Sequence, residues 1–178
     1  MSGVRSRNTG FTLLEILVVV VIIGILVTFA TLSIGNRALD DRLEVESERL
    51  EQTLRLASEE AETKGVELGF RYTANGYGFY VTGKDGKWAP YAESGPLRLR
   101  ELAAPFYLEL HVDGRLVKPA LDPQDGKDVK IEPQVLLLSS GEISASTFDM
   151  KAENYGPYYR VEAETLGKIT RARRDQGS

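Results

Sequence analysis

The sequence predicts an α+β protein, in which a long N-terminal α-helix packs by its second half on an all-antiparallel β head of one or two sheets. Two observations predict the helix. Residues 16–36 carry no charged side chain, and apolar residues then recur at helical spacing as far as residue 61. The head is predicted by a change of period after Gly65, where apolar and polar residues begin to alternate between glycine-containing turns.

The length, net charge and cysteine content of the chain argue against several kinds of function. A length of 178 residues suits one compact domain with an anchor. The net charge of −4 argues against binding to nucleic-acid phosphates, which requires clustered lysine and arginine. The chain has no cysteine, so disulfides and thiolate metal sites are excluded.

The first half of the helix is predicted to cross a membrane. Residues 11–36 are almost continuously apolar, and about 20 such residues span the roughly 30 Å hydrocarbon core of a bilayer. Arg5 and Arg7 lie in the polar leader, residues 1–10, and predict a cytoplasmic N-terminus with the rest exported. A secretory signal peptide or a plain membrane anchor is the alternative interpretation.

Glu15 is the one charged residue inside this apolar block. Placing an acidic side chain at the centre of a membrane helix costs about 2.5–3.5 kcal/mol, and a position near the helix end costs less. Charged residues in such segments usually have a partner and a function, so Glu15 is a candidate functional residue.

The second half of the helix, residues 37–64, is predicted to be an amphipathic continuation with one apolar stripe buried against the head. The stripe consists of Leu39, Leu43, Leu50, Leu54, Ala57 and Ala61. Gly65 is predicted to end the helix, with Lys64 in its last turn. A coiled coil is the alternative, although Glu46 and Ser47 interrupt the stripe.

Residues 65–172 are predicted to form the β head, with about eight short strands. The predicted strands are residues 66–72, 77–81, 106–112, 116–117, 135–138, 146–150, 158–163 and 168–172. Asn75-Gly76 gives the strongest hairpin signal. Residues 119–128 are expected to form an exposed loop, and residues 173–178 a flexible polar tail.

No catalytic, cofactor or metal site is predicted, so the chain is not expected to be an enzyme. His111 is the single histidine and is expected to face solvent from a strand, beside Tyr107 and Glu109. An acidic group invites a calcium interpretation, but its spacing fails the EF-hand pattern and a solvated loop is expected instead. The group consists of Asp122, Asp125, Asp128 and Glu132.

The stretch Gly10-Phe11-Thr12-Leu13-Leu14-Glu15 resembles the class III signal of type IV pilins and type II secretion pseudopilins. The resemblance implies a pilin-like fold and a prepilin leader, residues 1–10, that a prepilin peptidase cuts off between Gly10 and Phe11. It also implies N-methylation of Phe11. Glu15 would be the fifth residue of the mature chain and would pair with the Phe11 amine of a neighbouring subunit during assembly.

The sequence of the head indicates which member of these families the chain resembles. Residues 133–143, followed by Thr147-Phe148-Asp149, resemble the strand-turn-strand of the H-type minor pseudopilin of type II secretion. This implies a structural subunit that assembles into or caps the periplasmic pseudopilus, anchored by one pass in the bacterial inner membrane with its head in the periplasm. The implied partners are the other minor pseudopilins, the major pseudopilin, the prepilin peptidase and inner-membrane lipid, with secreted exoproteins as a further partner. No nucleic acid and no cofactor are expected.

Two alternatives remain at this point. A minor pilin of a type IV pilus, used in pilus assembly or DNA uptake, has the same architecture, and a basic stripe on the head would favour it. The sequence offers only Arg171, Arg173 and Arg174 for such a stripe. A membrane-anchored periplasmic binding domain is the second alternative, and it would not require Gly10 before Phe11.

Overall fold

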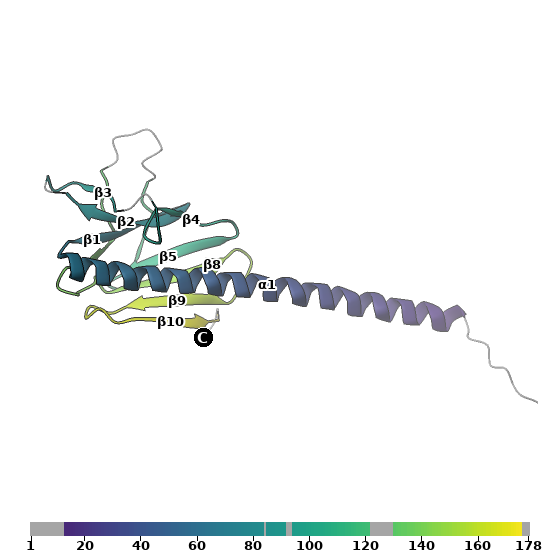
Figure 1. Ribbon diagram of the computed structural model, residues 1–178. Helices are drawn as coiled ribbons and strands as arrows, with labels where there is room; N and C mark the ends of the chain where they lie inside the picture. The colour runs from purple at the N-terminus through teal and green to yellow at the C-terminus, as the bar shows by residue number, and fades with distance from the viewer. Residues whose placement is uncertain (1–12, 84, 92–93, 122–129, 176–178) are drawn as a thin grey trace, which may run out of the picture. The chain divides into compact units, whose positions relative to one another are not determined.

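The computed structural model describes residues 13–83, 85–91, 94–121 and 130–175, with the side chains of residues 29–36 left out. The chain divides into two compact units, residues 1–40 and residues 41–178. Helix α1 (Leu13–Lys64, 52 residues) contributes to both units, and all the strands belong to the second unit (Figure 1).

Helix α1 ends where the sequence predicts. Gly65 has a φ of +63°, which glycine adopts without the steric cost of a β-carbon. The Val66 N–H donates to the Ala61 carbonyl at 3.1 Å, and the Gly65 N–H donates to the Glu62 carbonyl at 3.4 Å. These two bonds form the Schellman arrangement, which satisfies carbonyls left open at a helix end.

The strands of the head form two antiparallel sheets (Figure 1). The first sheet has the order β3-β2-β1-β7, and β4 also pairs with β2. Its strands are β1 (Leu68–Thr73), β2 (Gly76–Thr82), β3 (Trp88–Pro90), β4 (Arg100–Glu101) and β7 (Val135–Leu137). The second sheet has the order β10-β9-β8-β5-β6. Its strands are β5 (Phe106–Val112), β6 (Arg115–Val117), β8 (Ser146–Ala152), β9 (Tyr158–Ala163) and β10 (Ile169–Arg174).

Both sheets share one core with the second half of α1. The predicted apolar stripe is buried from Leu43 to Ala61, with Leu43, Leu50 and Leu54 at 0% exposure. Ser47 is also fully buried, because its hydroxyl donates to the Glu44 carbonyl at 2.7 Å and needs no water. A small polar residue that satisfies itself in this way does not interrupt the buried face.

Phe70 connects the two sheets at the centre of the core. Its ring lies 5.6 Å from Phe79 and 5.5 Å from Tyr77, both on the neighbouring strand β2. It also lies 5.0 Å from Phe148 of β8, in an edge-to-face arrangement. Edge-to-face and offset aromatic pairs add to the burial of the rings themselves, so this cluster holds one sheet on the other.

The predicted α+β class with an antiparallel head is confirmed, and each predicted strand has a counterpart. Strand β4 was not predicted, because its two residues carry no alternation, and β3 was not predicted as a strand either. Strand β10 runs two residues further than predicted, because Arg173 and Arg174 pair with Tyr159 and Tyr158 of β9. Most of the predicted loop at 119–128 lies outside the described residues.

Candidate assembly surface

The large apolar side chains that the structure describes in the first half of α1 are exposed. From Leu13 to Val27 the large apolar residues are 43–85% exposed. A continuous apolar surface of this kind marks an interaction site, because water does not solvate it favourably. In the part of the chain that the structure describes, no helix has both the length and the apolar character that a membrane crossing needs. The crossing by residues 11–36 stays a prediction.

Glu15 lies in the first turn of α1, with an exposed side chain. The free N–H groups of a helix N-terminus favour a nearby carboxylate, so this position suits the charge. Gly10 and Phe11 lie outside the described residues, so the cleavage and methylation sites stay predictions.

Arg100 joins the first sheet to the helix. Its Nη2 lies 2.7 Å from Oε1 and 2.8 Å from Oε2 of Glu46, and its Nε lies 3.2 Å from Oε2. Two-point contacts between guanidinium and carboxylate are among the stronger ion pairs and also fix orientation. This contact was not predicted from the sequence. The sequence shows only that Arg98 and Arg100 stand at alternate positions beside Leu99, and this does not identify the carboxylate that either arginine meets.

Arg171 joins the second sheet to the helix. Its Nε lies 3.3 Å from Oε2 of Glu51, its Nη1 lies 3.6 Å from Oε1 of Glu44, and the side chain is 20% exposed. Arg173 pairs with Asp175 at 3.4 Å. Two of the three arginines considered for a nucleic-acid stripe are therefore paired with carboxylates of the same chain, Arg171 on the helix and Arg173 at the exposed end of β10.

The outer surface of the second sheet carries two further ion pairs. Arg160 makes two bonds of 2.7 Å to the carboxylate of Asp149, which is only 2% exposed. This bonding raises the pKa of Arg160, because it favours the charged guanidinium. Lys151 lies 2.5 Å from Glu109 on the adjacent strand β5. Both pairs join neighbouring strands, so we interpret them as structural.

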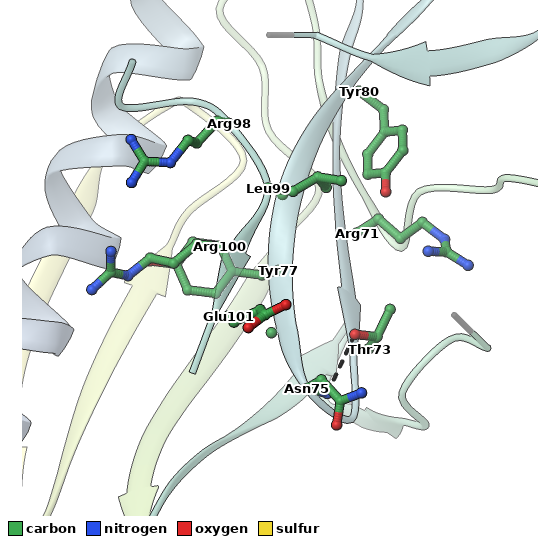
Figure 2. A pocket seen from close by; sticks show the side chains of 11 residues that line it. Arg71, Thr73, Asn75, Tyr77, Tyr80, Arg98, Leu99, Arg100 and Glu101 are labelled. Carbon is green, nitrogen blue, oxygen red and sulfur yellow. Dashed lines mark hydrogen bonds between the residues drawn. The ribbon is translucent and has the colours of Figure 1, made fainter. Parts of the chain in front are cut away.

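A hollow of about 460 Å³ lies along β1 and β2 (Figure 2). Arg71 lines the hollow, and its side chain is 2% exposed. Nη2 of Arg71 donates to the Leu121 carbonyl, and the guanidinium carbon lies 5.9 Å from the centre of the Tyr80 ring. Gly76 and Gly78 leave room for the segment that carries Leu99, because a β-carbon at Gly76 would lie 1.9 Å from the Arg100 carbonyl oxygen. The hollow therefore forms where β4, together with the residues that precede it, packs on β2.

His111 lies half-buried on β5, opposite Thr147 of β8 and Leu116 of β6. Among the described residues, no three histidine or acidic side chains lie close enough together to hold a metal ion. Glu132 pairs with Lys130 at 2.6 Å. The rest of the acidic group, Asp122, Asp125 and Asp128, lies outside the described residues, so the expectation of a solvated loop remains untested.

Comparisons with known proteins agree with this arrangement. Residues 5–31 match the family model of the prokaryotic N-terminal methylation motif. The chain is 30% identical over 171 residues to the type II secretion system protein H of Aeromonas hydrophila, covering 93% of each chain. It is 34% identical over 158 residues to the protein of that name from Pseudomonas aeruginosa, covering 86% of this chain and 88% of the relative.

Solved structures show the same fold. The minor pseudopilin EpsH from the type 2 secretion system of Vibrio cholerae superimposes with a TM-score of 0.62 at 22% identity, covering 76% of this chain and 97% of EpsH. E. coli GspH gives a TM-score of 0.51 at 18% identity, covering 70% of this chain and 82% of GspH. Both likenesses concern the fold.

Proposed function

The chain belongs to the family of type II secretion system protein H, and we propose that it works as a structural minor pseudopilin of the periplasmic pseudopilus. The observation that carries this function is the likeness to protein H of Aeromonas hydrophila over 93% of both chains. It includes the methylation motif as well as the head, so it favours a type II secretion subunit over a minor pilin of a type IV pilus.

We infer that the N-terminal segments of the chain have different roles. Residues 1–10 act as a leader that the prepilin peptidase removes after Gly10, and Phe11 becomes the methylated N-terminus. Residues 11–36 hold the subunit in the inner membrane and later lie among the helices of the filament. The exposed apolar side chains from Leu13 to Val27 support this role, because they need either lipid or other helices as cover.

Glu15 is the residue that we assign to assembly. Cleavage after Gly10 leaves an α-amine at Phe11, which is cationic at neutral pH because its reference pKa is about 8. A carboxylate in an apolar surrounding is stabilised by a cation. The pairing of Glu15 with the Phe11 amine of a neighbour would therefore favour subunit addition over free diffusion in the membrane.

The head, residues 41–175, presents the surfaces that other subunits contact. We propose the other minor pseudopilins and the major pseudopilin as its partners, with exported proteins as a further contact. The ion pairs of Arg100, Arg160 and Arg171 support a structural role, since they hold the helix and strands in one fixed arrangement.

The test replaces Glu15 by valine in a strain that lacks the chromosomal copy, and measures secretion together with recovery of the protein in sheared pseudopili. Glu59→Val is the matched control, because Glu59 is an exposed acid on the same helix within the head. We expect Glu15→Val to abolish secretion and incorporation, and Glu59→Val to leave both near wild type. Normal incorporation of Glu15→Val would contradict the assembly role, and secretion that does not need the chain at all would contradict the proposed function.

A further inference from the structure

A groove of about 320 Å³ lies in the head between residues 49–56 of α1 and residues 95–100, the segment that leads into β4. Leu56 and Pro96 form its apolar part, and Arg49, Arg98 and Arg100 bring three guanidinium groups to it. Leu97, at 4% exposure, holds the 95–100 segment in the core. The groove therefore has a fixed wall on each side.

The three arginines differ in how their charge is compensated. Arg100 is bound at two points by Glu46. Among the described residues, neither Arg49 nor Arg98 has a carboxylate within ion-pair distance, and Nη1 of Arg98 lies 3.5 Å from the Gly95 carbonyl oxygen. Figure 2 shows Arg98 and Arg100 extending toward the helix, on the opposite side of β2 from Arg71 and Tyr80.

Several other arginines of the head are matched with acids, whereas the buried Arg71 is held by the Leu121 carbonyl and lies over the Tyr80 ring. Arg55 and Arg171 pair with Glu51, and Arg160 pairs with Asp149. Two guanidinium groups on one groove without such a match form a site for a carboxylate, because the planar guanidinium binds carboxylate oxygens at two points.

We propose that this groove, formed by Arg49, Arg98, Leu56 and Pro96, receives an acidic side chain from a neighbouring pseudopilin subunit. This inference rests on the proposed function and adds to it the contact surface and the chemistry of the partner. The carboxylate lies between Arg49 and Arg98, and the apolar part takes the stem of that side chain or an adjacent apolar residue. Charge complementarity at such a contact gives specificity and fixes register.

The surroundings favour a single acidic side chain over an extended polyanion. Glu46, Glu48 and Glu51 lie on α1 within one turn of Arg49, and Glu48 accepts a 3.1 Å hydrogen bond from Gln52, which lines the groove. These carboxylates repel a nucleic-acid backbone or an anionic lipid surface, which needs a broad basic patch. One carboxylate placed between the two arginines avoids that repulsion.

The experiment measures binding of the full chain, purified in detergent micelles, to each purified pseudopilin of the same secretion system. It compares wild type with the double reversal Arg49→Glu/Arg98→Glu at low and high salt. The matched control is Arg115→Glu/Lys118→Glu, which makes the same charge change at two exposed positions on and beside β6. We expect the groove reversal to weaken binding to one pseudopilin about tenfold or more, and the control to change it less than about twofold.

A second variant removes the charge without reversing it. Arg49→Gln/Arg98→Gln keeps much of the side-chain volume, and it should show a smaller loss in the same direction with a reduced dependence on salt. An acid-to-arginine change on the affected pseudopilin should restore binding to the reversed groove. Far-UV circular dichroism and thermal unfolding of each variant report whether the head has folded.

The outcomes separate the two claims. Wild-type affinity of a folded Arg49→Glu/Arg98→Glu variant would overturn the groove inference and leave the proposed function intact. A loss confined to binding of vesicles of phosphatidylethanolamine and phosphatidylglycerol, with pseudopilin binding unchanged, would also overturn it. If the wild-type chain binds no pseudopilin and secretion does not require it, the proposed function fails.

Discussion

Tyr77 allows a sharp test of the core between helix and sheet. Its side chain is 4% exposed, and within the described part of the head its hydroxyl has no hydrogen-bond partner. The nearby Thr53 hydroxyl donates instead to the Leu50 carbonyl at 3.0 Å. A buried hydroxyl without a partner costs about 1–3 kcal/mol, so Tyr77→Phe should leave the free energy of unfolding at pH 7 unchanged or raise it by about 1 kcal/mol.

The free energy of unfolding should also depend on pH through Tyr77, and the direction of this dependence can be predicted. Burial raises the pKa of Tyr77 to about 12, and the charge of Glu46 adds to the effect while that of Arg100 opposes it. The unfolded chain releases the phenolic proton near pH 10, so unfolding releases a proton between about pH 10 and pH 12. Stability therefore falls as the pH rises through this window, by about 2–3 kcal/mol from Tyr77 alone.

The assay is urea unfolding of the full chain in detergent micelles, followed by the emission of Trp88, the one tryptophan of the chain. Tyr72→Phe is the matched control. Tyr72 is equally buried, but its hydroxyl donates to the Val117 carbonyl, so its removal should cost about 1 kcal/mol at pH 7. Opposite signs for the two variants at pH 7 are expected. A loss of more than about 1 kcal/mol for Tyr77→Phe, or an alkaline slope like that of wild type, would refute the reasoning.

Two further substitutions test the helix end and the sheet junction. Gly65→Ala should lower the free energy of unfolding by about 1 kcal/mol, because the φ of Gly65 is +63° and strains any residue with a β-carbon, although the space around it is open. Gly156→Ala is the control. Gly156 also has open space around it but an ordinary φ, so this change should be near neutral in the same urea titration. Phe70→Ala should cost about 3–5 kcal/mol in that titration, because the ring contacts both β2 and β8; a cost below about 1 kcal/mol would mean that Phe70 does not connect the sheets.

The sequence predicts the elements of this fold well, because their signals are local. The alternation around Phe70 and Tyr72, the Asn75-Gly76 turn and the glycine after Lys64 each depend on a few neighbouring residues. Leu50 and Leu54 similarly identify the buried face of the helix, and the structure buries both completely.

The contacts that join the elements were not predictable in the same way. Arg100 meets Glu46 across 54 positions of sequence, and Arg171 meets Ser47 across 124. A list of charged residues does not show which of them the fold brings together, so Arg171 looked like a possible surface cation although it packs on the helix. The unmatched pair Arg49 and Arg98 became visible only once the partners of their neighbours were known.

The most direct test of a pilin-type subunit is the chemical state of its N-terminus. The measurement is N-terminal sequencing with intact mass on the membrane-extracted protein, co-expressed with its prepilin peptidase. A pilin-type subunit is expected to give a mature chain that begins at N-methylated Phe11, with residues 1–10 removed. An uncleaved chain, or a cut beyond Ile34, would contradict it.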